Sequence, residues 1–535
     1  MRVRITILLL LALAAGGDAA GQQTEAAKLV PPKGTDAKRL GSSVAISGDW
    51  ILAGDPSIDG GVAHFFHRDP GGWTFRQSGR GSESSKFGFA ISIDGDTAII
   101  GAPLWDYSNT RSGKVYVYEL QNEQWVRTQG IVPSDVDWQC RYGLAVAVSG
   151  DVLVVGAPNQ TYFTLNDGEV FVYERTAGTW ELVKRFFLPR TPEVSNLLYR
   201  FLGASVAIDG NILVAGAPGD TGGAVVYERG PNGWALEAVL EDPTPTAKDQ
   251  FGASVAISGT TIVVGEPAEG AGAARPGSAF IFERDASGTW VFDKEIKASD
   301  GFATANGGDR FGRSVAIDGA SIFVGMPFGQ ITGPSTGTGY LFRRGPKGWP
   351  VTETERMVAA RSSGFGDGLG NRVGIDGGFM VAGAKGALSG GAKQGAVYVF
   401  ETELGSSFCA ANPNSTGMPA RLTAIGSLRA SDQDLTLSVR QCPKKRAGFF
   451  AMSLNRARRP MGAGVLCLGA RVHRLLPLVA TGPGGHAFHD TDFGSPIVAG
   501  RLAAGTTLCF QFLYLDPAGA PGGMNLSNAI AVTLD

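Results

Sequence analysis

Three glycines recur at a fixed spacing in seven successive segments of the chain, and this repeat limits the possible folds more than any other feature. In every segment a second glycine follows the first by seven residues, and a third follows the first by 13 residues. A Ser-Gly or Asp-Gly pair stands between two short apolar runs, and such pairs suit tight hairpin turns because glycine adopts positive φ without strain. The spacing therefore predicts seven β-hairpins of one geometry. The first glycines are Gly41, Gly88, Gly143, Gly203, Gly252, Gly312 and Gly370.

Two further strands follow each hairpin. In the second segment residues 114–118 are predicted to form the third strand, and a tryptophan, Trp125, lies near the start of the fourth. Four strands in 50 to 60 residues make one propeller blade. We expect the tryptophans at this position to pack between blades: Trp73, Trp125, Trp180, Trp234, Trp290 and Trp349.

The seventh segment ends after its third strand, at residues 397–400. Residues 25–31 resemble a fourth strand, so we expect them to complete the last blade and close the ring, which removes two free sheet edges. The alternative is that the N-terminal segment is disordered.

These motifs resemble the FG-GAP repeat, which also builds the propeller of integrin α subunits. Phe87-Gly88 with Gly101-Ala102-Pro103 is the clearest match, whereas Leu40, Tyr142, Leu202 and Leu369 replace the phenylalanine and Gly383-Ala384-Lys385 lacks the proline. The resemblance implies an all-β fold, with a seven-bladed β-propeller over residues 21–404 whose repeats start near residues 40, 87, 142, 202, 251, 311 and 369.

Calcium sites of the integrin type are not expected. Calcium takes six to eight oxygen ligands, but the connection that would hold them is a two-residue turn here. The carboxylates at this position stand alone beside their glycine, so we expect each to cap its own turn and predict no metal site. They are Asp94, Asp209, Asp318 and Asp376.

The long loops that follow the third glycine should gather on one face of the ring, and loops of this kind commonly carry function. Two of them hold aromatic residues next to carboxylates, which could bind a sugar or a peptide. The candidate ligand-binding residues are Trp105, Asp106, Tyr107, Tyr162, Phe163 and Asp167. The alternative is that these side chains only pack their own loops.

The N-terminus has the features of a signal peptide. Arg2 and Arg4 precede an apolar run over residues 5–15, which is too short to span a bilayer, and small residues surround Ala19. We therefore predict cleavage of residues 1–20 and a secreted or cell-surface bacterial protein without a transmembrane segment. An uncleaved anchor is the alternative.

A second domain is predicted over residues 405–535, where the glycine repeat stops and four of the five cysteines lie. An even number of cysteines in an exported domain suggests two disulfides, and spacing alone allows three connectivities. Alternating runs such as residues 507–515 predict a small disulfide-bonded β-sandwich-like domain. The remaining cysteine, Cys140, is expected to be a buried free thiol.

This second region resembles a C-terminal β-domain of secreted proteins from planctomycete-like bacteria. The matching segments include Asn414-Ser415-Thr416-Gly417 and Leu466-Cys467-Leu468-Gly469. The resemblance implies the disulfide pairs Cys409–Cys467 and Cys442–Cys509. It leaves the role of the domain open, with surface attachment or secretion as hypotheses.

No catalytic motif stands out. The chain has neither a Gly-x-Ser-x-Gly elbow, nor His-Glu-x-x-His, nor a P-loop, and His486 and His489 stand three apart, which puts them on opposite faces of a strand. The formal net charge of −2 gives no reason to expect nucleic acid or an acidic membrane as partner. We predict a monomeric, non-catalytic binding or adhesion scaffold, without cofactors, for an extracellular protein or glycan. A propeller hydrolase or lyase and a purely structural envelope protein are the alternatives.

Overall fold

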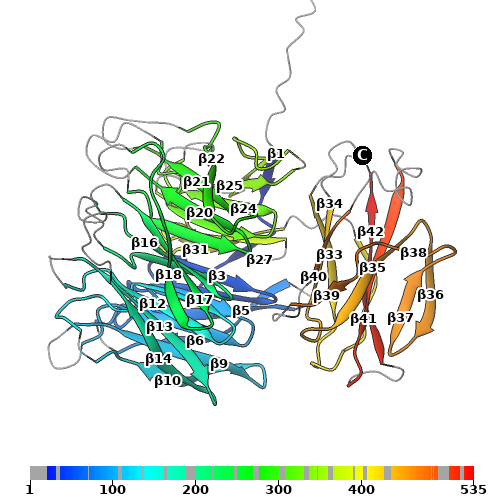
Figure 1. The fold of residues 1–535 in the computed structure, drawn as a ribbon, viewed down its shortest axis with the longest axis horizontal. Helices are drawn as coiled ribbons and strands as arrows, with labels where there is room; N and C mark the ends of the chain where they lie inside the picture. The colour runs from blue at the N-terminus through cyan, green and yellow to red at the C-terminus, as the bar shows by residue number, and fades with distance from the viewer. Residues whose placement is uncertain are drawn as a thin grey trace, which may run out of the picture.

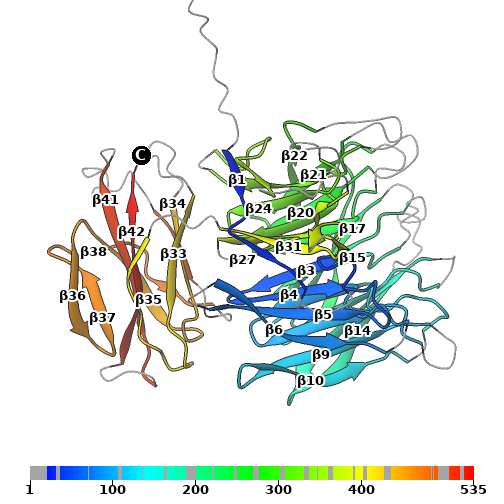
Figure 2. The ribbon, with the colours of Figure 1, turned by 180° about the vertical axis from the view of Figure 1, so that it is seen from behind.

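The computed structural model places the chain in two groups of β-sheets, drawn side by side in Figure 1 and Figure 2. It describes residues 21–534 apart from residues 32–36, 70–71, 83, 107–110, 135, 162–165, 188–200, 220–221, 246–249, 269–275, 302–307, 330–335, 346, 360–365, 377, 390–391, 402–405, 427–434, 483–484, 486, 492–504 and 519–522. The predicted signal peptide, residues 1–20, lies outside the described residues. The described residues form strands and turns and no helix, as the all-β prediction requires.

Within the described residues, the larger group consists of seven sheets, each built on four antiparallel strands, which we number as blades 1 to 7. A fifth strand, parallel to its neighbour, extends blade 6. Blades 1 to 3 consist of β3 (Ser43–Ser47), β4 (Trp50–Asp55), β5 (Val62–Asp69) and β6 (Gly72–Arg80); β7 (Ala90–Asp94), β8 (Thr97–Ala102), β9 (Lys114–Gln121) and β10 (Gln124–Ile131); and β11 (Ala145–Ser149), β12 (Val152–Ala157), β13 (Glu169–Thr176) and β14 (Thr179–Phe186).

Blades 4 and 5 consist of β15 (Ser205–Asp209), β16 (Ile212–Gly216), β17 (Ala224–Gly230) and β18 (Gly233–Leu240); and β19 (Ser254–Ser258), β20 (Thr261–Glu266), β21 (Ser278–Arg284) and β22 (Trp290–Ile296). Blade 6 consists of β23 (Ser314–Asp318), β24 (Ser321–Met326), β25 (Thr338–Arg343) and β26 (Glu355–Val358), and β1 (Gly21–Thr24) adds to its outer edge in parallel.

Blade 7 is completed by the N-terminus, as predicted. Its inner strands are β27 (Leu369–Asp376), β28 (Phe379–Ala384) and β31 (Ala396–Glu401), and its outer strand is β2 (Ala27–Leu29), which pairs antiparallel with β31. A small hairpin, β29 (Leu388–Ser389) and β30 (Ala392–Lys393), extends the connection between β28 and β31. The innermost strands of successive blades lie side by side, and β27 of blade 7 also lies beside β3 of blade 1, so the ring is closed.

The first and third glycines of the repeat are required where neighbouring blades meet. A Cβ on Gly101 would stand 2.1 Å from the carbonyl oxygen of Gly143 in the next blade, closer than any real contact. Gly143 itself has a φ of +84°, which side chains rarely adopt. The same approach joins blade 7 to blade 1, where a Cβ on Gly383 would meet the oxygen of Gly41 at 2.1 Å.

Hydrogen bonds between the hairpin turns run around the ring. The Ser or Asp before the middle glycine accepts the N–H of the middle glycine in the next blade, for example from Gly150 to Asp94 at 2.6 Å and from Gly48 to Asp376 at 2.6 Å. The expectation that each Asp caps its own turn is therefore wrong, because the next blade's turn is brought within reach by the ring. The other pairs are Gly95 to Ser47, Gly210 to Ser149, Gly259 to Asp209 and Gly319 to Ser258.

The hydrophobic core lies between blades, and the tryptophans belong to it as predicted. Trp125 of blade 2 stacks on Phe65 of blade 1 with ring centroids 5.3 Å apart. Its backbone exchanges two hydrogen bonds with the side chain of Gln77, at 2.9 and 2.7 Å. Because each cluster draws buried side chains from two adjacent blades, the ring is stabilised as a whole rather than blade by blade.

The smaller group of sheets forms a sandwich. One sheet has the order β32 (Ser406–Cys409), β42 (Met524–Thr533), β41 (Thr507–Leu515), β35 (Ala447–Ser453) and β38 (His473–Arg474), and β39 (Val479–Ala480) also pairs with β35. The other contains β33 (Arg421–Gly426), β34 (Leu435–Arg440) and β40 (Ala487–Asp490). A hairpin of β36 (Arg456–Met461) and β37 (Gly464–Leu468) covers the outer face of the first sheet.

One of the two predicted disulfides is present. Cys409 and Cys467 are bonded, whereas Cys442 and Cys509 are buried free thiols, so the predicted pair Cys442–Cys509 is wrong. Side chains alternate between the faces of β41, and Cys509 points to the β36–β37 side while Cys442 belongs to the core between the two sheets. A sheet separates the two thiols, and no disulfide can span it. Cys140 is a buried free thiol, as expected.

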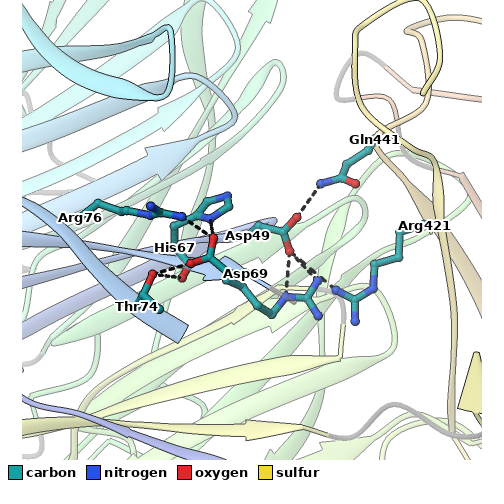
Figure 3. Close-up of polar contacts among 8 residues, drawn as sticks. Asp49, His67, Asp69, Thr74, Arg76, Arg421 and Gln441 are labelled. Carbon is teal, nitrogen blue, oxygen red and sulfur yellow. Dashed lines mark hydrogen bonds and ion pairs between the residues drawn. The ribbon is translucent and has the colours of Figure 1, made fainter. Parts of the chain in front are cut away.

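The sandwich docks on the propeller face that carries the glycine turns, which we call the turn face. Arg440, at the end of β34, is buried and forms ion pairs with Asp376 of blade 7 at 2.6 Å and with Asp318 of blade 6 at 3.0 Å. Figure 3 shows the neighbouring contact, in which Gln441 donates to Asp49 of blade 1 at 2.9 Å and Arg421 approaches the same carboxylate at 3.7 Å. The sandwich therefore leaves the opposite face of the ring, the loop face, uncovered.

Candidate functional site

A hollow of about 440 Å³ opens on the loop face between blades 1 and 2. Three connections line it: the one between β4 and β5, the one between β6 and β7, and the one between β8 and β9. Its volume lies in the range of small-ligand pockets. The lining residues are Ser57, Ile58, Asp59, Gly60, Ser84, Lys86, Leu104 and Arg111.

A buried carboxylate holds the first of these connections in place. Asp55, at the end of β4, accepts the backbone N–H groups of Lys38 at 2.7 Å and Arg39 at 3.0 Å through Oδ2. Its Oδ1 accepts the N–H of Ser57 at 3.1 Å, and the Ser57 hydroxyl donates to the same oxygen. Because this carboxylate is fully used by four donors, it positions Ser57 and is not available to a ligand.

Backbone hydrogen bonds join the connections to one another. Phe87 N–H donates to the carbonyl of Gly60 at 3.0 Å, and the Ser85 hydroxyl donates to the same carbonyl at 2.8 Å. The N–H of Leu104 donates to the carbonyl of Ser85 at 3.1 Å. The floor of the hollow is therefore preformed, which lowers the entropic cost of binding a ligand there.

The charged groups of the hollow are two cations and one carboxylate. Arg111 is exposed, and its guanidinium lies 4.0 Å from the carboxylate of Asp106. The backbone N–H of Arg111 donates a hydrogen bond to the same carboxylate at 3.2 Å. Asp59 accepts the N–H of Ser84 at 3.4 Å. Among the described residues Lys86 has no ion-pair partner for its ammonium group, although it lies beside the opening. The hollow thus combines free positive charge with hydroxyl groups and two aliphatic side chains.

The backbone conformation of the repeat places Lys86 at the hollow. Its φ is +58°, and the residues that precede the repeat aromatic in other blades share this conformation, with φ values of +59° at Arg141 and +62° at Arg310. The backbone before the repeat aromatic therefore turns in the same way in these blades, and only the side chain differs. Sequence reasoning missed Lys86 and Arg111 because nothing in the repeat pattern distinguishes them from ordinary loop residues.

The structure separates the residues that the sequence suggested as ligand contacts. Asp106 lies at the rim through its contact with Arg111, but Trp105 packs against the core between blades 1 and 2 and lies under the ammonium of Lys114, 4.8 Å from the ring centroid. Asp167 lies in the connection between β12 and β13 and does not line the hollow. Tyr107, Tyr162 and Phe163 lie outside the described residues.

Two histidines of the described chain, His64 and His489, lie in the packed interior. His64 is buried in β5, and its Nδ1 lies 2.9 Å from the Ser78 hydroxyl. Burial lowers the pKa of His64 to about 4, which keeps the ring neutral at physiological pH. His489 is buried and stacks on Phe450, whereas His486 lies outside the described residues. Within the described residues, no three side chains of the His, Cys, Asp or Glu type come together as they would around a metal ion.

None of the described segments forms a helix of the length and hydropathy that crossing a bilayer requires. A comparison with curated proteins finds no significant match. The model of the FG-GAP repeat matches four segments, residues 80–118, 125–173, 234–282 and 290–342. The last three of these begin at the outer strand of one blade and end in the third strand of the next, so each match covers an interface between blades. The chain therefore contains FG-GAP repeats, and these four segments of the propeller are members of that repeat family.

Proposed function

We propose that this protein is a non-catalytic extracellular binding scaffold that takes up a glycan or peptide with an acidic group in the hollow between blades 1 and 2. The observation that carries the proposal is the pair of cations, Lys86 and Arg111, at a preformed hollow on the face that the sandwich leaves open. FG-GAP repeats, a disulfide and the lack of a membrane-spanning helix in the described chain are compatible with an extracellular protein.

The chemistry of the lining supports binding rather than catalysis. The lining residues include no histidine or cysteine, and the Ser57 hydroxyl donates to a buried carboxylate that holds the loop. A carboxylate or sulfate group could bridge the ammonium of Lys86 and the guanidinium of Arg111. The Ser84 hydroxyl can donate a hydrogen bond to a ligand hydroxyl group or accept one from it, and the Asp59 carboxylate can accept one.

An array of glycans and peptides probed with the full chain tests the proposal. We expect the bound set to be rich in acidic groups, and Lys86→Ala with Arg111→Ala to weaken binding at least tenfold, because hydrogen bonds to charged groups contribute about 1.5–3 kcal/mol each. Arg141→Ala is the matched control, since Arg141 has the same backbone conformation in the next blade and does not line the hollow.

Two results would contradict the proposal. If no array member binds, the protein has a structural role without a ligand of this kind. If the double variant and the control bind equally well, the ligand site lies elsewhere. Turnover in a hydrolase screen, with and without EDTA, would instead favour the propeller hydrolase or lyase.

A further inference from the structure

The near-neutral charge of the whole chain conceals a strongly basic segment in the sandwich. Residues 435–489 contain no Asp or Glu, although nine Lys or Arg residues lie there. One of them, Arg440, is neutralised by the propeller. The others have no carboxylate of their own segment to pair with, so their charge is available to a partner.

Five of these arginines gather around β36 and β38, and we call them the basic edge: Arg456, Arg458, Arg459, Arg471 and Arg474. All five are exposed, and within the described residues none forms an ion pair. Arg456 lies over the ring of Phe408 at 4.5 Å and Arg474 over the ring of Phe449 at 4.2 Å. Both rings belong to the sheet face that the β36–β37 hairpin covers, so these arginines share one side of the sandwich.

Aliphatic side chains stand among these arginines. Leu476, two residues after Arg474, is 69% exposed, and Leu478 is 58% exposed. Both lie between β38 and β39, at the open edge of the sheet beside β35. Leu454, two residues before Arg456, and Val472, directly after Arg471, are also exposed. A group of exposed aliphatic side chains with charged residues around it is typical of a surface that meets a protein or membrane partner.

The orientation of the basic edge leaves it free to meet a large surface. β36, β37 and β38 lie at the end of the sandwich remote from the propeller in both Figure 1 and Figure 2. The sandwich contacts the propeller through Arg421, Arg440 and Gln441, which belong to other strands or to the turn after β34. A surface bound at the basic edge would therefore leave the loop face of the propeller pointing away from it.

We propose that the basic edge docks on the surface of an anionic phospholipid bilayer. Arginine fits this role because its guanidinium pairs with phosphate groups in a bidentate manner, and its stem lies along apolar surface. Leu476 and Leu478 would enter the boundary between head groups and acyl chains, where their burial adds to the electrostatic attraction. A polyanionic glycan or nucleic acid would be held by charge alone and would leave these leucines exposed. The inference does not depend on the ligand of the loop face.

Co-sedimentation with vesicles tests this proposal on the full chain. We expect binding to vesicles of equal parts phosphatidylglycerol and phosphatidylcholine, and none to phosphatidylcholine alone. Arg458→Gln, Arg459→Gln and Arg471→Gln together should weaken binding on the order of 100-fold at low salt, since each basic side chain at an anionic surface contributes about fivefold. These three arginines make no ring or ion-pair contact among the described residues, so the fold should be kept.

A charge-matched variant separates the basic edge from the net charge. Lys444→Gln, Lys445→Gln and Arg446→Gln remove three exposed cations before β35, and we expect less than about a threefold loss. Leu476→Ser with Leu478→Ser should weaken binding to the anionic vesicles about tenfold, and the binding that remains should decrease more steeply with salt concentration. A chain beginning at residue 21 is measured in parallel, because the apolar residues 5–15 could bind lipid themselves.

Four outcomes would overturn the proposal. They are equal binding to both vesicle types, equal losses in the two triple variants, binding that disappears with residues 1–20, and binding to a sulfated polysaccharide without binding to vesicles. Binding that needs the anionic lipid, the three arginines and the two leucines would support it.

Discussion

The docking of the sandwich on the propeller depends on one buried arginine, and its removal makes a sharp prediction. Burial opposes the charge of Arg440, but Asp376 and Asp318 more than offset this effect, so the pKa of Arg440 is raised. Arg440→Met would leave two neighbouring carboxylates without their cation. Loss of one partner from a buried ion pair costs about 3–5 kcal/mol. The side chains of Asp318 and Asp376 are 21% and 18% exposed, so water partly solvates the carboxylates that remain. We therefore expect the lower value, about 3 kcal/mol.

Denaturant unfolding can assign this loss to the sandwich. All nine tryptophans lie between residues 50 and 349, so tryptophan fluorescence reports the propeller while circular dichroism reports both groups of sheets. Arg440→Met should lower the free energy of the transition seen by circular dichroism more than that of the transition seen by fluorescence. Asp376→Asn should cost less, because the side chain can still accept the N–H of Gly48.

A double-mutant cycle between Arg440→Met and Asp376→Asn should give a coupling energy of about 2 kcal/mol. Arg458→Met is the control, and we expect a change within about 0.5 kcal/mol because that side chain is exposed. A coupling energy near zero would refute the reasoning. It would mean that the two side chains do not attract each other in the folded protein and that other contacts hold the sandwich in place.

Three further predictions follow from the packing. Gly101→Ala should destabilise the propeller by on the order of 3 kcal/mol in denaturant unfolding, because its Cβ would collide with the Gly143 carbonyl, whereas Gly230→Ala, which meets nothing within 4 Å, should be nearly neutral. Burial lowers the pKa of His64 from 6.5 to about 4, so the unfolded chain takes up the proton first and stability falls as the pH drops below 6.5. Between pH 7 and pH 4.5 the free energy of unfolding of His64→Gln should therefore fall by about 2 kcal/mol less than that of the natural chain. An equal fall in both proteins would contradict the lowered pKa of His64. Denatured, unreduced protein should react with three equivalents of a thiol reagent, and a single equivalent would show that a second disulfide exists after all.

The blades could be predicted from sequence because their signals are local. A Ser-Gly or Asp-Gly pair between two apolar runs specifies a hairpin wherever it occurs, and its repetition at constant spacing specifies a blade. Closure by β2 was also predictable, since the last segment lacks an outer strand and the N-terminus supplies one. The Cys409–Cys467 bond was predictable only through resemblance to a known domain.

The partners of the turn carboxylates and the composition of the hollow could not be predicted in this way. Asp94 accepts the N–H of Gly150, which lies 56 residues away in the sequence, because the ring brings successive turns together. No local sequence pattern indicates that these two residues meet. Lys86 and Arg111 come from separate connections that meet only when two blades pack. The faces of β41 decide that Cys509 and Cys442 stay apart, and the face of a side chain depends on register rather than on spacing between cysteines.

The sequence alone determined the strands, the turns and the number of blades, because glycine conformation and alternating polarity act over a few residues. Only the tertiary structure decided which turns cap which, where the sandwich sits and which cations remain without a counter-ion. Those outcomes depend on distances between residues far apart in the chain, and these distances exist only after the ring has closed.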